Sequence, residues 1–199
     1  MNDNNTRLGI LLMIGATFVF AMQDGISRHL AGEYNVYMVL MIRYWFFAAF
    51  VMVVASRKAG GLRAAAATTQ PILQTARALI LIVEIMVTVI AFVVLGLIPT
   101  HAIFASYPLM IAALSGPVLG ERVGPRRWLA IFAGFIGILI ILRPGFAVFT
   151  PAALIPLAAA FLFALYGLLT RYAARRDSAA TSFFWTGTVG ALGMTAIGA

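Results

Sequence analysis

The stretch GPVLGERVGPRR, from Gly116 to Arg127, is a short polar link between two strongly apolar runs, AIFASYPLMIAALS before it and WLAIFAGFIGILIIL after it. Charged residues are rare in the rest of the sequence. The chain of 199 residues is 63% hydrophobic and only 10% charged, with a mean hydropathy of +1.01. A soluble domain carries about 25% charged residues. Apolar runs joined by polar links of this kind indicate an integral, all-α membrane protein that crosses the bilayer several times.

A hydrocarbon core about 30 Å thick requires about twenty apolar residues for each helical span. The first such segment contains Gln23 and Asp24 and has no cleavage site before a polar domain, so we interpret it as a retained span and not as a signal peptide. The segments that we predict to span the membrane are Leu8–Ile26, Tyr37–Ala55, Ala78–Leu97, Ala102–Leu119, Trp128–Leu142, Ala153–Thr170 and Ala179–Gly198.

Basic residues are distributed unevenly between the two sides that these spans define. Because positively charged links stay in the cytoplasm, the N-terminus is predicted to be cytoplasmic, and a bacterial inner membrane is the expected location. The side that holds the N-terminus carries Arg7, Arg57, Lys58, Arg63, Arg77, Arg122, Arg126, Arg127, Arg171, Arg175 and Arg176, whereas the other side carries Arg28 and Arg143.

Several classes of protein are disfavoured by the composition. The sequence has no cysteine, which excludes disulfides, thiolate metal sites and a thiol nucleophile, and His29 and His101 are too few for a histidine metal cluster. The net charge of +8 would favour nucleic acid in a soluble chain, but here membrane orientation explains it. We therefore expect a lipid bilayer and a small-molecule substrate as partners, with no nucleic acid, metal or cofactor.

The sequence also contains a weak internal repeat. The segment LLMIGATFVFAMQDGISRH aligns with LIPLAAAFLFALYGLLTRY, pairing Phe20 with Phe163 and Arg28 with Arg171 at one constant offset. Five predicted helices separate the copies, so the second copy enters the membrane from the opposite side. This predicts a bundle of inverted five-helix repeats, with a first unit at residues 1–145 and the start of a second at 151–199. Inverted repeats are typical of secondary transporters, whose substrate site lies at the repeat interface.

The run YPLMIAALSGPVLGERVGPRRWLAIFAGFIGILIILRPG, Tyr107 to Gly145, resembles the end of the first repeat in EamA-type members of the drug/metabolite transporter superfamily. The resemblance rests on a proline-containing fourth helix, the LGE link, a glycine-rich fifth helix and the Pro-Gly exit. Arg43 also matches an arginine of the second helix in that family. The resemblance implies a carrier of small metabolites with ten helices in two inverted halves. Seven of these ten helices are predicted in this chain.

Three ionisable residues lie inside the predicted spans, where each costs about 2.5–3.5 kcal/mol on the insertion scale. Asp24 and Arg43 lie near the same outer side and are placed to form a pair. Glu84 lies two turns inside the third span, with Arg77 and Thr88 near the same helical face. We expect Arg43 to attract an anionic group of the substrate and Glu84 a cationic group or a proton, with purely structural pairing as the alternative for all three.

Weaker candidates surround these charges. Tyr44 and Tyr107 offer rings for a planar substrate, Gln23 offers a hydrogen-bonding amide, and Pro108 points to the cavity because it loosens the fourth helix, although packing is the alternative for each. In the opening stretch, Glu121 is predicted to pair with Arg122 and with free amide groups of the next helix. Glu121 and Arg122 are therefore expected to form a structural hairpin lock, with a transport gate as the alternative.

We predict a secondary transporter that moves a small organic metabolite, such as an amino acid, a nucleoside-type or a vitamin-like compound, by alternating access. A membrane-embedded enzyme is disfavoured because the sequence has no H-E-x-x-H motif and no paired carboxylates. A channel or non-transporting membrane subunit is the third alternative. We also expect about three further spans beyond this chain, unless it is a natural seven-span protein or a homodimer completes the cavity in trans.

Overall fold

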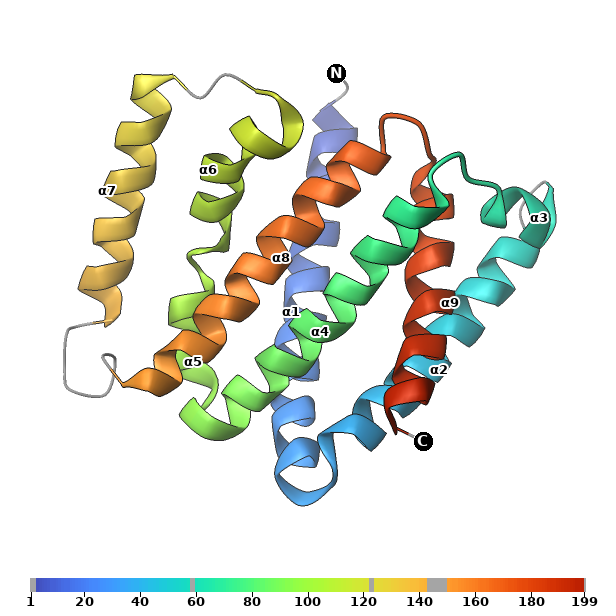
Figure 1. Cartoon of the computed structure of the whole chain (residues 1–199), viewed down its shortest axis with the longest axis horizontal. Coiled ribbons are helices and arrows are strands. Elements are labelled where there is room, and N and C mark those ends of the chain that lie inside the picture. Colours follow the sequence, from blue (N-terminus) through green and yellow to red (C-terminus); the bar gives the residue numbers. More distant parts are fainter. Residues whose placement is uncertain (1–2, 58–59, 122–123, 143–149, 199) are drawn as a thin grey trace.

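The computed structural model describes residues 3–57, 60–121, 124–142 and 150–198, and the side chains of residues 3–7, 141 and 142 lie outside that description. All regular secondary structure in these ranges is helical, as the apolar composition predicts (Figure 1). The elements are α1 (Asp3–Glu33), α2 (Val36–Ser56), α3 (Gly61–Ala66), α4 (Pro71–Leu95), α5 (Leu97–Phe104), α6 (Tyr107–Leu119), α7 (Pro125–Leu142), the short 3-10 helix η1 (Pro151–Ala153), α8 (Leu154–Ala173) and α9 (Ala179–Gly198).

Each predicted span has a helical counterpart, and the chain is an integral, multi-pass membrane protein. By length and composition, the segments of the described chain that are apolar enough to cross a membrane are Leu8–Glu33, Val36–Ser56, Pro71–Leu95, Leu97–Leu119 and Pro151–Ala173. Helices α7 and α9 coincide with the two other predicted spans. They are not among these five.

The fourth predicted span, in which we expected Pro108 to loosen the helix, is divided between α5 and α6. Gly96 ends α4 with a positive φ of 88°, a conformation that favours glycine, and α5 starts at the next residue. Two residues, Ala105 and Ser106, separate α5 from α6. Pro108 lies in the first turn of α6, where the N–H that proline lacks would have no helical hydrogen-bond partner. Pro117 lies inside α6, which continues past it to Leu119.

Helices α8 and α9 pack against helices that precede them in the sequence. Helix α8 lies against α4 and α6, and α9 lies against α2 and α4 (Figure 1). Gly187 and Gly190 of α9 face Val51 and Tyr44 of α2, where an added Cβ would press against those side chains. Because helix pairs in lipid associate through close packing of small residues, these glycines explain the contact between α2 and α9.

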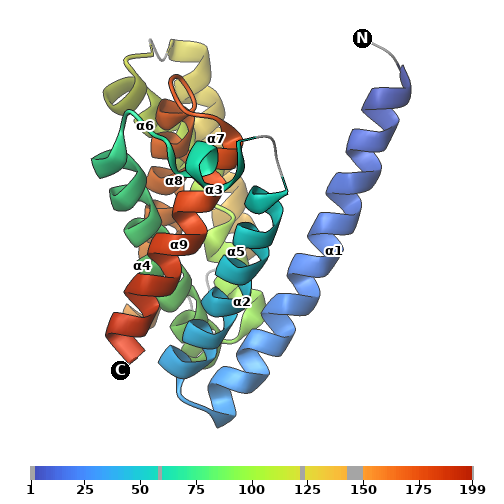
Figure 2. The same cartoon turned by 90° about the vertical axis from the view of Figure 1, so that its right-hand side faces the viewer.

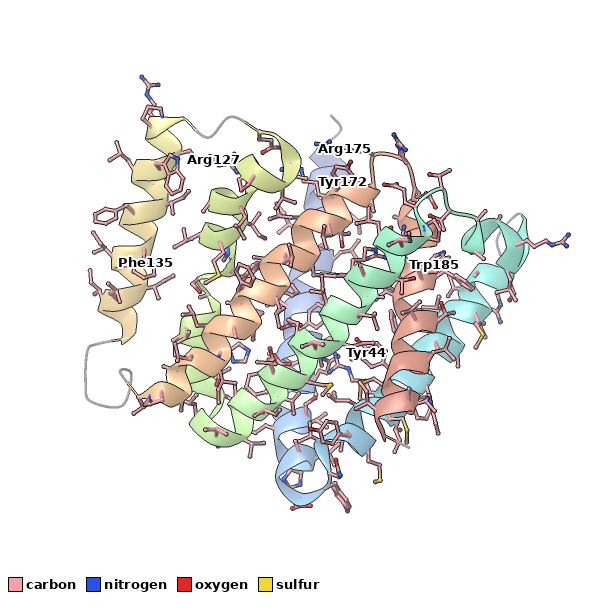
Figure 3. The ribbon with its side chains drawn as sticks, viewed as in Figure 1. Tyr44, Arg127, Phe135, Tyr172, Arg175 and Trp185 are labelled. Atoms are coloured by element: carbon pink, nitrogen blue, oxygen red, sulfur yellow. The ribbon has the colours of Figure 1, made fainter. Side chains whose placement is uncertain are left out.

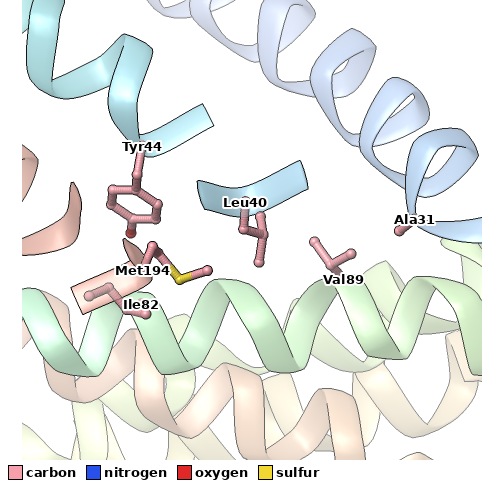
Figure 4. Packing of buried hydrophobic residues seen from close by; sticks show 6 residues of the cluster. All are labelled: Ala31, Leu40, Tyr44, Ile82, Val89 and Met194. Carbon is pink, nitrogen blue, oxygen red and sulfur yellow. The ribbon is translucent and has the colours of Figure 1, made fainter. Parts of the chain in front are cut away.

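The buried apolar cluster runs between α2, α4 and α9. Figure 4 shows Leu40 and Tyr44 of α2 opposite Ile82 and Val89 of α4, with Met194 of α9 beside them and Ala31 of α1 at the end of the row. The buried positions of α2 recur at spacings of three or four residues, so one face of α2 forms this contact.

The N-terminal half of helix α1 is not packed against the other helices. Residues 8–22 are all exposed, and Figure 2 shows the N-terminal half of α1 standing apart from the other helices. Its C-terminal half contacts α2, α4 and α5.

The N-terminus, α3, the link between α6 and α7 and the link between α8 and α9 lie at one end of the bundle (Figure 1). The turn between α1 and α2 and the elbow between α4 and α5 lie at the other. Successive links between the spans therefore lie at alternate ends of the bundle, as in the arrangement that we predicted from the distribution of basic residues. The link that we predicted to face outward, Pro144–Thr150, is outside the described residues except for Thr150.

Candidate functional site

Glu84 is the most deeply buried acidic residue among the predicted site residues. Its side chain, 4% exposed, accepts a hydrogen bond from Thr88 Oγ1 at 2.8 Å. Thr88 is the residue that the sequence places one turn further on the same face. Arg77, the other partner that we considered, directs its guanidinium elsewhere, and Glu84 makes no direct ion pair in the described part of the chain.

Arg43 and Tyr44, neighbours in α2, lie close to this carboxylate. Arg43 is half-buried and within electrostatic range of Asp24 and Glu84. Tyr44 is 3% exposed, lies within electrostatic range of Glu84 and Tyr166, and points from α2 into the bundle (Figure 3). Its buried hydroxyl has no hydrogen-bond partner among the described residues. A buried unpaired hydroxyl costs about 1–3 kcal/mol, which a ligand that hydrogen-bonds to it would recover.

We predicted from the sequence that Asp24 and Arg43 are placed to form an ion pair, but the structure does not pair them. Its Oδ2 lies 3.1 Å from Nε2 of His101, which α5 carries to α1. Our prediction placed His101 in the short link just before the fourth span, Ala102–Leu119. It missed this partner because the elbow at Gly96 turns the chain and brings α5 against α1. Arg43 is therefore left without a direct carboxylate partner in the described chain.

The weaker candidates separate into two groups. Tyr107 belongs to an aromatic cluster with Phe104, Phe163 and Tyr166, in which the Tyr107 and Phe163 rings are 4.9 Å apart and nearly perpendicular. This cluster extends from the break before α6 to α8, and the buried Ser106 hydroxyl at that break also lacks a partner among the described residues. Gln23 is half-buried beside Asp24, and Pro108 is exposed.

Arg77 is a buried residue that the sequence placed in a cytoplasmic link. Helix α4 begins seven residues before the predicted span, at Pro71, so Arg77 lies inside the bundle and is 1% exposed. Its five N–H groups have acceptors on three helices, and Tyr166 also lies under the guanidinium, with 5.7 Å between its ring centre and Cζ. The acceptors are Gln74 Oε1, Tyr166 OH, Thr170 Oγ1, Ser182 O and Thr186 Oγ1.

Gln74 connects Arg77 to Asp177 in the link between α8 and α9. Its Oε1 accepts from Arg77 Nε at 2.6 Å, and its Nε2 donates to Asp177 Oδ2 at 2.7 Å. Burial raises the pKa of Asp177, but hydrogen bonds from Thr68, Gln74 and the Thr69 backbone outweigh that effect and hold the pKa below its usual value. The buried positive charge is therefore balanced through an amide by a carboxylate in the link between α8 and α9.

Among the described residues, Glu121 pairs with two arginines that the sequence did not identify as its partners. Its carboxylate lies 3.5 Å from Arg127 Nη1 at the start of α7 and 2.7 Å from Arg171 Nη2 in the last turn of α8. Arg175 donates to the Leu119 carbonyl at 3.2 Å, and Figure 3 shows Arg127 and Arg175 at the same end of the bundle. Arg122, its predicted partner, is outside the described residues. The lock therefore joins α6 to α7 and also to α8.

These groups offer complementary chemistry between α2, α4 and α8. Arg43 donates hydrogen bonds, Glu84 accepts them, Tyr44 does either, and the aromatic cluster provides faces for a planar ring. No group of histidine and acidic residues in the described chain is arranged to hold a metal ion. The arrangement suits recognition of a polar organic molecule.

Comparison with known proteins agrees with this architecture. The model of the EamA-like transporter family matches residues 7–143. A riboflavin transporter of Vibrio cholerae is 28% identical over 174 residues, which cover 87% of this chain and 58% of that protein. A riboflavin transporter of Brucella anthropi is 36% identical over 80 residues, covering 40% of this chain and 28% of the relative.

A more distant relative, the S-adenosylmethionine uptake transporter of Rickettsia prowazekii, is 22% identical over 184 residues, covering 92% of this chain and 62% of the relative. The chain thus spans less than two thirds of the length of these relatives. No solved structure matches the chain significantly. Since the family model covers most of the sequence, including the broken fourth span and the lock at Glu121, the chain belongs to the EamA-like transporter family.

Proposed function

We propose that this protein transports a small organic metabolite across a bacterial inner membrane, with its N-terminus in the cytoplasm. The single observation that carries the proposal is a set of polar groups on α2 and α4, of which Tyr44 and Glu84 are buried and Arg43 is half-buried. Arg43 and Glu84 lack direct ion-pair partners in the described residues, and the Tyr44 hydroxyl lacks a hydrogen-bond partner there. Charged and unpaired polar groups raise the free energy of a protein inside a membrane, and a role in substrate binding would explain why the protein has them there.

The path for the substrate lies between two units, residues 1–145 and the unit that starts at 151. Helices α8 and α9 face α4 and α2, the two helices that carry Glu84 and Arg43. Movement of α8 and α9 relative to α2 and α4 would therefore expose these charges to one side and then to the other. This is the alternating exposure expected of inverted repeats.

Riboflavin is the first substrate that we propose, supported by the names of the relatives from Vibrio cholerae and Brucella anthropi. Its flavin ring is planar and presents an edge with two carbonyls and an imide N–H, while its ribityl chain carries hydroxyls. Arg43 is suited to donate to the carbonyls, Glu84 to accept from the N–H, and Tyr44 to bond a hydroxyl. The aromatic cluster, through Tyr107 and Tyr166, is suited to stack on the ring.

An S-adenosylmethionine-like substrate would use the same charges differently. Its carboxylate would pair with Arg43 and a positive group with Glu84, the arrangement that we predicted for a zwitterion. The relative from Rickettsia prowazekii supports this second substrate class, at lower identity.

Uptake by vesicles that contain the purified protein tests the proposal. We expect saturable uptake of radiolabelled riboflavin, and competition with unlabelled riboflavin, S-adenosylmethionine and amino acids ranks the substrate classes. Glu84→Gln should abolish most uptake at unchanged folded yield. Glu33→Gln, which changes an exposed glutamate of α1, is the matched control. Normal uptake by well-folded Glu84→Gln protein would contradict the assignment of the site.

A further inference from the structure

We propose that Ser106, at the break between α5 and α6, is a substrate-binding residue that hydrogen-bonds to the hydroxylated chain of a flavin-like substrate. This role rests on the proposed function, because Ser106 then belongs to the same substrate site as Arg43 and Glu84. Among the described residues, the buried side-chain oxygen and nitrogen atoms that lack a hydrogen-bond partner are the hydroxyl oxygens of Tyr44 and Ser106.

Ser106 occupies a position at which a serine usually stabilises its own helix. It directly precedes α6, where a serine hydroxyl commonly accepts a hydrogen bond from the second or third N–H group of the helix. The second residue of α6 is Pro108, which has no N–H, and the N–H of Leu109 donates to the Ser106 carbonyl at 3.0 Å. The hydroxyl makes no capping bond, so it does not serve α6 in the usual way.

Two other buried hydroxyls of α5 and α6 are satisfied within the fold. Thr100 Oγ1 donates to the Ala91 carbonyl at 3.1 Å, and Ser115 Oγ donates to the Ala112 carbonyl at 2.9 Å. Ser106 is only 3% exposed, so bulk water has little access to it. Because a buried hydroxyl without a partner raises the free energy of the protein, a ligand that bonds to Ser106 gains what the fold leaves unused.

The break places Ser106 next to the aromatic cluster. The Phe104 and Tyr107 rings, from the residues that flank the break, are 5.4 Å apart. The cluster continues across α8 to Tyr166, which lies within electrostatic range of Tyr44. The aromatic cluster therefore connects the two parts of the bundle that hold the unpartnered hydroxyls.

The break also lies at a suitable depth for a substrate site. Figure 1 shows it between the two ends of the bundle, beside α8, which contacts both α5 and α6. Carriers built from inverted repeats bind their substrates near the middle of the membrane, commonly where a helix is interrupted. Non-helical backbone at this depth is tolerated where protein or a cavity surrounds it.

The chemistry of these groups assigns them to different parts of the substrate. The guanidinium of Arg43 and the carboxylate of Glu84 suit the edge of a flavin ring, which carries carbonyls and an N–H group. A serine hydroxyl both donates and accepts, as does each hydroxyl of a ribityl chain. We therefore expect the ring to stack on the aromatic cluster while its chain reaches Ser106.

Flavin fluorescence titrations with two ligands test this assignment. Riboflavin carries the ribityl chain, whereas lumiflavin has the same ring with a methyl group in place of the chain. Ser106→Ala should weaken riboflavin binding about fivefold, the change that loss of one neutral hydrogen bond produces, and should leave lumiflavin binding unchanged. Ser115→Ala, the matched control, removes a buried hydroxyl of α6 that already has a partner, and it should bind both flavins as the wild type does.

Unfolding without substrate separates a binding role from a structural one. In mixed micelles with increasing SDS, Ser106→Ala should unfold at the same SDS fraction as the wild type or at a higher one, because the replacement removes no bond of the fold. A clear loss of stability, as replacement of a capping serine produces, would assign the hydroxyl to the fold and overturn the proposal.

Equal riboflavin affinity in the wild type and Ser106→Ala would also overturn it, as would equal weakening of both flavins. Glu84→Gln distinguishes these failures from failure of the proposed function, because it should weaken both flavins through the ring that they share. If Glu84→Gln does so while Ser106→Ala binds normally, the site at Arg43 and Glu84 stands without Ser106. Absence of flavin binding to the wild type would contradict the proposed flavin site itself, and the role of Ser106 with it.

Discussion

Replacement of Gln74 should most clearly reveal how α4 is held to α9 and to the link between α8 and α9. Its side chain, completely buried, lies between two charges on different parts of the chain. It accepts from Arg77 Nε at 2.6 Å and donates to Asp177 Oδ2 at 2.7 Å and to Ser182 Oγ at 3.3 Å. Gln74→Leu conserves the approximate volume and removes all three bonds.

The expected magnitude follows from the bond to Arg77. Hydrogen bonds to charged groups contribute about 1.5–3 kcal/mol each, and a buried charged donor left without a partner costs more. Asp177 is half-exposed, so water replaces much of its lost bond. We therefore expect Gln74→Leu to lower the free energy of unfolding by about 2–4 kcal/mol, mostly through the Arg77 guanidinium.

Reversible unfolding in mixed micelles with increasing SDS measures this change. Gln23→Leu, at a half-buried glutamine of α1, is the matched control and should change the free energy of unfolding by less than about 0.5 kcal/mol. A double-mutant cycle with Asp177→Asn should give a coupling energy clearly different from zero. If Gln74→Leu unfolds at the same SDS fraction as the wild type, the amide does not connect the two charges as we describe.

Three further predictions address stability and topology. Hydrogen bonds lower the pKa of Asp177 in the folded protein, so its charged form stabilises the fold above about pH 4, near the usual aspartate pKa. This stabilisation is lost as the pH falls through the lower pKa of the folded state. The free energy of unfolding, measured against pH, should show this acid loss in the wild type and not in Asp177→Asn. Gly190→Ala places a methyl group against the Tyr44 ring and should cost about 1–3 kcal/mol in the same SDS assay, whereas Gly15→Ala, with no atom within 4 Å of the added carbon, should not destabilise. A cysteine at Ala67 should react with an impermeant maleimide only after the cells are opened, and labelling of intact cells would reverse the predicted orientation.

Much of the fold follows from local features of the sequence. The positions of the spans follow from apolar length. The break before α6 agrees with Pro108, because proline is favoured in the first turn of a helix, although Pro117 is accommodated inside α6. The contact between Glu84 and Thr88 follows from helical spacing alone. These predictions needed no knowledge of which helices are neighbours.

The partners of Asp24 and Glu121 could not be predicted in this way. Glu121 meets Arg171 only because α8 packs beside α6, and Asp24 meets His101 only because Gly96 turns the chain. Arg77 was assigned to a link because its charge suited the cytoplasmic side. The proline at position 71 was a usable signal that α4 starts earlier, since proline is favoured in the first turn of a helix.

Binding of riboflavin to the purified protein tests the proposed substrate site most directly. Flavin fluorescence should be quenched by stacking on the aromatic cluster, and titration should give saturable binding to the wild type and to Glu33→Gln. Glu84→Gln and Arg43→Met should each weaken the binding at least about tenfold, which corresponds to about 1.4 kcal/mol. Absence of saturable binding to the wild type, or equal affinity in well-folded Glu84→Gln and Arg43→Met proteins, would contradict a riboflavin site at Arg43 and Glu84.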